Sequence, residues 1–145
     1  IVMNTLESLG ARLACMNVTA SEMAEIEALN EKMLAISDTA DSVDYFEVDM
    51  RFHRLITAAS HNASLIDTHA AYMARLWRPR FLAASLRRDR PRVLQQHGAI
   101  VKGLRTRDVT LVSAEVESHM RHLVLNITDI YDNKQNPTAL KAVGS

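Results

Sequence analysis

Apolar residues recur along most of the chain at spacings of three and four, which is the period of an α-helix with one buried face. The clearest run lies within 45–60, and its apolar members are Tyr45, Phe46, Val48, Phe52, Leu55, Ile56 and Ala59. No stretch alternates apolar and polar residues with the period of two that indicates a β-strand. The pattern therefore predicts an all-α protein.

The same pattern, divided at its polar joints, predicts six helices. Counted with their capping residues, they span about 2–16, 19–37, 42–60, 63–88, 91–106 and 108–133. Thr19 and Glu22 form a capping-box pattern, and Asp108 is a candidate cap for the last helix. Pro79 is expected to kink or interrupt the fourth helix near Arg78. Asn62 fits either the end of the third helix or the cap of the fourth. We expect an antiparallel six-helix bundle.

The first helix carries Leu6, Leu9, Leu13 and Met16 on one side. We expect residues 1–136 to form one domain, because 145 residues suit a single core, and residues 137–145 to form a frayed tail. The chain begins at Ile1 within an expected helix. It is therefore expected to be a fragment that lacks an N-terminal part.

Seventeen basic residues balance seventeen acidic ones, so the chain lacks the overall positive charge that usually accompanies nucleic-acid binding. Cys15 is the single cysteine, which excludes an internal disulfide and fits a reducing cytosol. No apolar run approaches the length of a membrane span, and no signal peptide is visible. We expect a cytoplasmic protein without a membrane segment.

Asp49 and His53 stand one helical turn apart, about 6 Å along the axis, on the apolar face of their helix. A carboxylate that faces the interior needs a cation, a hydrogen-bond network or a metal. His97 and His119 fall on later helices at positions that can also point inward. Imidazoles and a carboxylate are the ligands expected for Zn, Ni, Mn or Fe, so these four residues are the candidate metal ligands.

Other residues leave alternatives open. His122 lies one turn after His119 and competes with it, whereas His61 stands in a turn and needs no special role. Seven arginines cluster around the end of the fourth helix, namely Arg75, Arg78, Arg80, Arg87, Arg88, Arg90 and Arg92. Most are expected to be solvated. Arg80, in phase with Leu76, is the best candidate to turn inward and pair with an anionic ligand.

Three blocks of the sequence together resemble the FCD domain, the C-terminal effector-binding domain of FadR-type GntR-family regulators. The first is Asp49 to Ile56 followed by Ala58 to Asn62, with His61 in place of the family's glycine. The second is Gln96 to Ile100 with Arg107 and Asp108, where Gln96 replaces Glu and Arg107 replaces Gly. The third is a histidine 22 residues after His97, which selects His119 over His122. Six helices, rather than seven, resemble the VanR-like branch.

The resemblance implies a ligand sensor with a winged helix-turn-helix domain before it. Such proteins dimerise and bind DNA through that domain, and a small organic acid binds beside a divalent metal in the helical bundle. Asp49, His53, His97 and His119 would hold the metal, with zinc as the first candidate. Arg80, Tyr72, His69 and Asn126 are the candidate effector contacts. The family often has arginines before its first Leu-Glu pair, where this chain has Met3 and Asn4.

Two other classes of function stay open at this point. A metal-dependent enzyme could use the same ligands, although the sequence shows no nucleophile motif and no obvious general base, and we expect no enzyme. A structural dimerisation bundle could use the histidines as hydrogen-bonding core residues. Turnover of candidate acids by the metal-loaded protein would support the first class. Chelator treatment that changes neither thermal stability nor ligand binding would support the second.

Overall fold

The computed structural model describes residues 1–135, and over this range it contains seven α-helices and one short 3₁₀ helix. No strand occurs among these residues, as the sequence predicted. The helices are α1 (Val2–Asn17), α2 (Ala20–Ile36), α3 (Ser42–Ala58), α4 (Ala63–Arg75), α5 (Trp77–Ala84), α6 (Arg90–Thr106) and α7 (Val109–Gln135), with η1 (Arg87–Asp89) before α6. The predicted tail 137–145 lies outside the described residues.

The prediction of six helices is wrong, because the expected fourth helix is two helices. α4 ends at Arg75, and α5 begins at Trp77 after a break at Leu76. A proline clashes with the carbonyl four residues before it and donates no backbone hydrogen bond. For Pro79, the carbonyl that would clash belongs to Arg75, the last residue of α4. Pro79 is also the third residue of α5, a position whose backbone N–H would have no helical partner in any case. The proline thus ends one helix and is tolerated at the start of the next.

The helix starts follow the predicted caps. The Thr19 Oγ1 accepts from the Glu22 backbone N–H at 3.2 Å, and a Glu22 carboxylate oxygen accepts from the Thr19 N–H at 2.9 Å. Asp108 Oδ1 accepts from the Leu111 N–H at 2.9 Å. Asn62 is the N-cap of α4. The left-handed residue at that turn is its neighbour His61, with φ 54°.

Arg107 occupies the left-handed position at the end of α6, also with φ 54°. A glycine would adopt this conformation without strain. The arginine side chain forms hydrogen bonds that a glycine could not form, because its guanidinium donates to the carbonyls of Cys15, Met16 and Val18 at 2.8–2.9 Å. These are the free carbonyls at the end of α1. Arg107 therefore joins the end of α6 to the end of α1.

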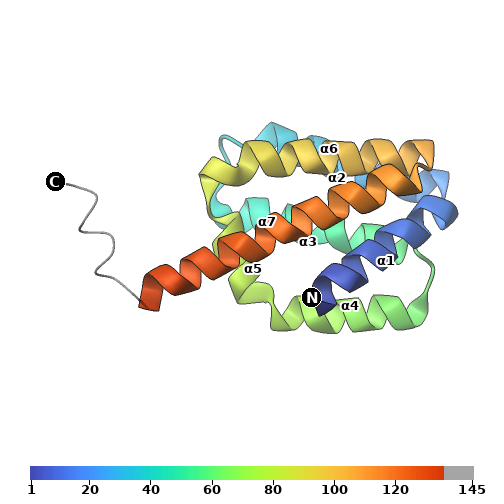
Figure 1. Cartoon of the computed structure of the whole chain (residues 1–145). Helices are drawn as coiled ribbons and strands as arrows, with labels where there is room; N and C mark the ends of the chain where they lie inside the picture. Colours follow the sequence, from blue (N-terminus) through green and yellow to red (C-terminus); the bar gives the residue numbers. More distant parts are fainter. Residues whose placement is uncertain (136–145) are drawn as a thin grey trace.

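α1 lies between α4 and α7 and packs on α3, α4, α6 and α7 (Figure 1). Its buried face differs from the leucine side noted in the sequence, since Leu9 is 41% and Met16 61% exposed. The buried face carries small residues that let four helices approach, together with a single carboxylate. It consists of Met3, Glu7, Gly10, Ala11, Ala14 and Cys15.

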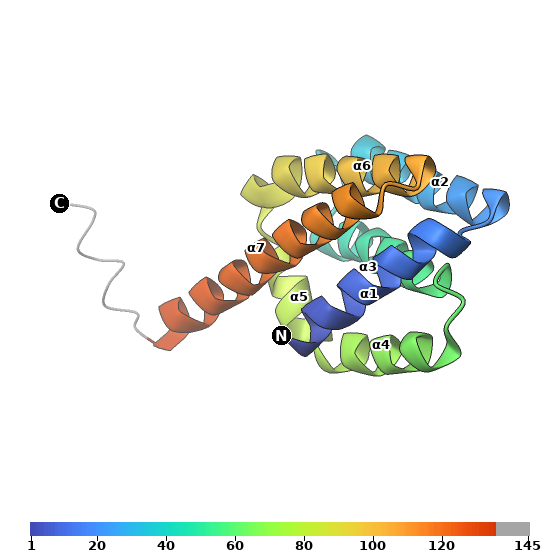
Figure 2. The same cartoon turned by 45° about the vertical axis from the view of Figure 1, so that its right-hand side comes forward.

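The remaining contacts complete the bundle. α2 packs on α3 and α6, and α5 packs on α7 and α3. α7 lies beside α1 and extends past the rest of the bundle, as both views show (Figures 1 and 2). Among residues 1–135, no helix is both long enough and apolar enough to span a membrane. Because α3, α6 and α7 all pack on α1, their inward side chains can meet.

Candidate metal centre

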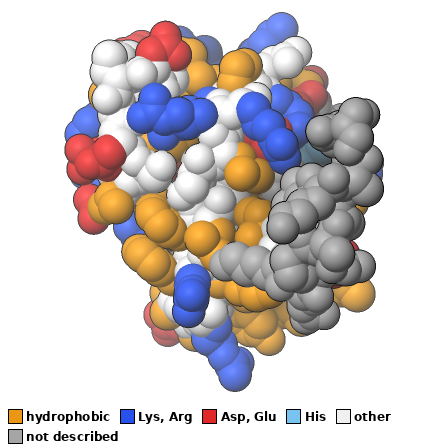
Figure 3. Space-filling view, turned by 90° about the vertical axis from the view of Figure 1, so that its left-hand side faces the viewer, with side chains coloured by type: hydrophobic (Ala, Val, Ile, Leu, Met, Phe, Trp, Pro, Cys, Tyr) orange, Lys and Arg blue, Asp and Glu red, His pale blue; other side chains and the backbone are white. Residues whose placement is uncertain are grey.

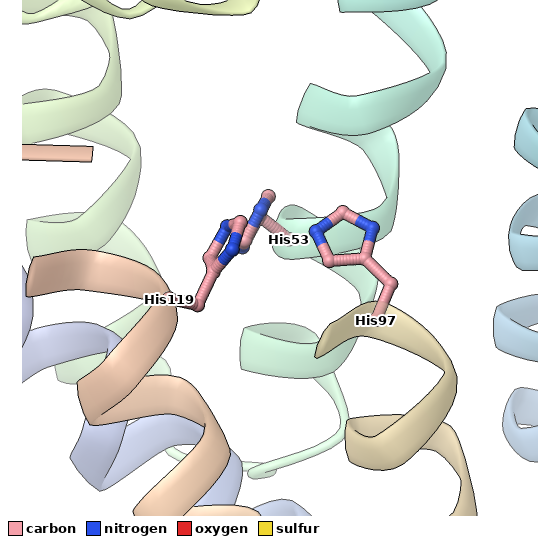
Figure 4. Close-up of side chains that lie close together, drawn as sticks. All are labelled: His53, His97 and His119. Atoms are coloured by element: carbon pink, nitrogen blue, oxygen red, sulfur yellow. The ribbon is translucent and has the colours of Figure 1, made fainter. Parts of the chain in front are cut away.

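Three histidines from three helices point toward one another in the interior (Figure 4). His53 comes from α3, His97 from α6 and His119 from α7, and one ring nitrogen of each lies within 4.8 Å of the others. Two nitrogens that bind one zinc ion at about 2.1 Å are at most about 4.2 Å apart. Small side-chain shifts are enough to bring these nitrogens to coordinating distances.

Asp49 adds a carboxylate to the same point. Its Oδ1 lies 3.5 Å from His53 Nε2 and 3.5 Å from His97 Nε2. The sequence predicted the first of these contacts from the one-turn spacing along α3. The second contact joins α3 to α6, and no local sequence pattern predicts a contact between two distant helices.

The polar atoms that converge here are buried and lack hydrogen-bond partners. Within residues 1–135, this holds for Asp49 Oδ1, His53 Nε2 and His97 Nε2. A buried polar group without a partner costs about 1–3 kcal/mol. Several such atoms directed at one point are therefore explained best by a cation that binds between them, and the donor set fits a divalent transition metal.

Glu7 of α1 holds His53 from the other side, a contact that the sequence did not reveal. Glu7 Oε2 lies 2.8 Å from His53 Nδ1, and Glu7 Oε1 accepts from His69 Nε2 at 3.0 Å and from Arg80 Nη1 at 3.2 Å. With Nδ1 donating to Glu7, the His53 Nε2 faces Asp49 and His97. A carboxylate behind a metal-binding histidine is the usual device for fixing its tautomer.

The other two imidazoles are also held. His119 Nδ1 donates to Gln96 Oε1 at 3.1 Å, which turns its Nε2 to the other side of the ring. The Phe52 ring stacks on His97, with centroids 4.4 Å apart and an angle of 18° between the planes. The competing histidine, His122, is outside the three-histidine group, and its Nδ1 lies 2.8 Å from the Ser118 carbonyl oxygen.

The charges of the cluster are distributed unevenly. Burial alone would lower the pKa of His53, but the carboxylates of Glu7 and Asp49 raise it to about 9. Burial lowers the pKa of His97 to about 3 and also lowers that of His119, so both are neutral imidazoles. The pKa of Asp49 is lowered despite its burial, chiefly by His53, so the carboxylate is ionised.

The family model of the FCD domain matches residues 2–122, which is most of the chain. The chain belongs to the FCD-domain family. This identifies it as a regulatory effector-binding domain of the kind found at the C-terminus of GntR-family transcriptional regulators. A comparison with curated proteins found no match. The VanR-like branch loses the support of a six-helix count, because this FCD domain has seven α-helices in its described part.

A pocket opens beside the histidines of the FCD domain. The pocket has a volume of about 40 Å³, and its walls include Asp49, Arg80, His119 and Asn126. Arg80 and Asn126, two predicted effector contacts, thus lie at this pocket. His69 contacts Glu7 instead, and Tyr72 lies at a different hollow between α1 and α7.

The arginine cluster divides into solvated and buried members. Arg75, Arg78, Arg87 and Arg88 are exposed, as expected for most of the cluster. Lys and Arg side chains lie next to apolar ones on the face seen from the left of Figure 1 (Figure 3). Arg80 turns inward and is 2% exposed. Arg90 is also buried, although the sequence gave no sign that separated it from its neighbours.

Proposed function

We propose that this FCD domain senses a small organic acid at a buried divalent metal and so controls the DNA binding of an attached winged helix-turn-helix domain. One observation supports the proposal most strongly. Buried atoms of Asp49, His53 and His97 that have no hydrogen-bond partner among the described residues lie next to the Nε2 side of the His119 ring. Hydrogen bonds from neighbouring residues hold two of the three imidazoles in place without occupying the converging nitrogens.

Asp49, His53, His97 and His119 would be the metal ligands. Three imidazoles and one carboxylate suit zinc, with nickel, manganese and iron as further candidates. An ion held there supplies open coordination positions at which a carboxylate can replace water.

The acid would lie in the pocket beside the ligands, where Arg80 and Asn126 line the wall. Arg80 Nε is buried and has no partner among the described residues, so it can donate to a bound carboxylate. His69 would act indirectly, because it contacts Glu7, which in turn contacts His53 and Arg80. Tyr72 lies at another hollow and has no contact with the acid in this proposal.

Binding of the acid can regulate DNA only if the acid prefers one arrangement of the whole regulator. In our proposal the regulator is a homodimer, and the acid changes how the two DNA-binding domains are held. The link from the pocket to α1 through Arg80 and Glu7 offers a physical route for that coupling. A network of charged hydrogen bonds responds when an anion arrives at one of its members.

Metal content of purified variants tests the proposal. We expect about one divalent ion per native chain and loss of the ion in His97→Ala and in His119→Ala, with helical circular dichroism retained. His61→Ala is the matched control, because His61 lies on the surface against Glu22 and should leave metal content unchanged. Undiminished metal in His97→Ala and His119→Ala would contradict the assignment.

A further inference from the structure

The pocket beside the histidines has one guanidinium in its wall that no carboxylate of the described residues neutralises. Arg80, Arg90 and Arg92 all line it, together with Asp49, Asp89 and Tyr45. Arg80 pairs with Glu7, and Arg92 pairs with Asp89, each at 3.2 Å. Arg90 forms no such ion pair with the described residues. It is therefore the guanidinium whose charge is not balanced by a nearby carboxylate.

Arg90 is nevertheless almost fully buried, with 4% of its surface exposed. Its Nη1 donates to the Ser37 carbonyl, and its Cζ lies 4.1 Å from the centre of the Tyr45 ring. Its Nε and Nη2 have no hydrogen-bond partner in the part of the chain that the structure describes. A buried charge is expensive unless it is paired. Two free donors on a buried cation at a pocket wall favour an anionic occupant.

Tyr45 supplies a further donor next to Arg90. Its hydroxyl is buried and, among residues 1–135, has no partner. Burial and the nearby charge of Asp49 raise the pKa of Tyr45, so the hydroxyl keeps its proton. Tyr45 also precedes Asp49 by one turn of α3, which is about 6 Å along the helix axis. Tyr45 and Asp49 thus lie on the same face of α3, and both line the pocket together with Arg90.

We infer that the pocket binds a short dicarboxylate, with one carboxylate at the proposed metal and Arg80 and the other at Arg90 and the Tyr45 hydroxyl. This inference rests on the proposed metal-dependent acid sensor and adds the class of acid. The narrow pocket favours a short chain between the two carboxylates. Arg92 stays neutralised by Asp89, which leaves Arg90 as the partner for the second negative charge.

Calorimetry on the zinc-loaded native protein tests this inference with three pairs of acids of equal chain length. The pairs are malonate with propionate, succinate with butyrate, and glutarate with valerate. We expect at least one dicarboxylate to bind at least tenfold more tightly than its monocarboxylate partner, because charge-assisted hydrogen bonds are strong. Tyr45→Phe should reduce that ratio several-fold, and Arg90→Gln should bring it close to one. Arg88→Gln is the exposed control.

Arg90 also contacts the end of α2, so Arg90→Gln could unfold the domain. Tyr45→Phe removes only a hydroxyl without a described partner and keeps the test decisive. The inference is overturned if no dicarboxylate binds more tightly than its partner, or if Tyr45→Phe leaves the ratio unchanged. Zinc-dependent binding of the monocarboxylates in that case would leave the sensor proposal standing. A native protein that takes up no metal would overturn both.

Discussion

At the scale of single residues, Glu7 connects the centre of the bundle to the candidate site. Its carboxylate contacts His53, which is 46 residues away, and His69, which is 62 residues away. The helical period predicts that Asp49 and His53 share a face, because that geometry is local. It cannot predict which distant side chains meet Glu7. The small residues Gly10, Ala11 and Ala14 on the same face were the one sign that Glu7 lies in a close helix contact.

Glu7→Gln keeps the shape of the side chain and removes its charge. Arg80 would then stay buried without a carboxylate partner, which typically costs about 3 kcal/mol or more. We predict that the free energy of unfolding, measured by urea denaturation, falls by about 3 kcal/mol. Glu47→Gln on the exposed side of α3 is the control and should change it by less than about 0.5 kcal/mol. If the two substitutions change the free energy of unfolding equally, the charge of Glu7 does not stabilise the folded domain.

At the scale of helices, the sequence predicted the ends well and the packing poorly. Caps such as Thr19 and Asp108 act within four residues, so a local pattern contains them. The close approach of α6 to α7 depends on Gly103 instead. A Cβ at Gly103 would lie 2.4 Å from Val112 Cγ2 and 3.3 Å from the Val112 backbone nitrogen. The sequence shows Gly103 and Gly98 only as two glycines in one helix.

The two glycines should respond in opposite ways to alanine. Gly103→Ala must displace Val112, and such overpacking typically costs about 1–3 kcal/mol. A Cβ at Gly98 meets nothing within 4 Å, so Gly98→Ala should gain about 0.5–1 kcal/mol from the lower flexibility of the unfolded chain. Chemical denaturation of both variants measures the difference. If Gly103→Ala proves as stable as Gly98→Ala, α6 and α7 are not packed as the structure has them.

At the scale of the whole molecule, the candidate site exists only when α3, α6 and α7 are assembled around α1. The sequence supplied the four proposed ligands, because each lies on the apolar face of its helix or fits a family block. The pocket, the burial of Arg90 and the division of the fourth predicted helix follow from packing. Assembly also brings together buried polar atoms that lack partners without a cation. A metal should therefore stabilise the folded chain as a whole.

Thermal unfolding with and without zinc tests this stabilisation. A ligand at about 100 times its dissociation constant adds about 2.7 kcal/mol to the stability of the folded state. For a domain of this size, that corresponds to a rise in Tm of roughly 8–10 °C. We predict such a rise on adding zinc to chelator-treated protein and none in His97→Ala. An equal rise in His97→Ala would mean that zinc binds elsewhere.

The most direct measurement is the position of the bound ion in crystals of the zinc-loaded protein, located by anomalous scattering at the zinc absorption edge. We predict one strong peak between His53, His97 and His119, at about 2.0–2.2 Å from their nitrogens and from an oxygen of Asp49. A histidine cluster without a peak, with zinc bound at another position such as the surface pair of Glu22 and His61, would contradict the proposed metal site.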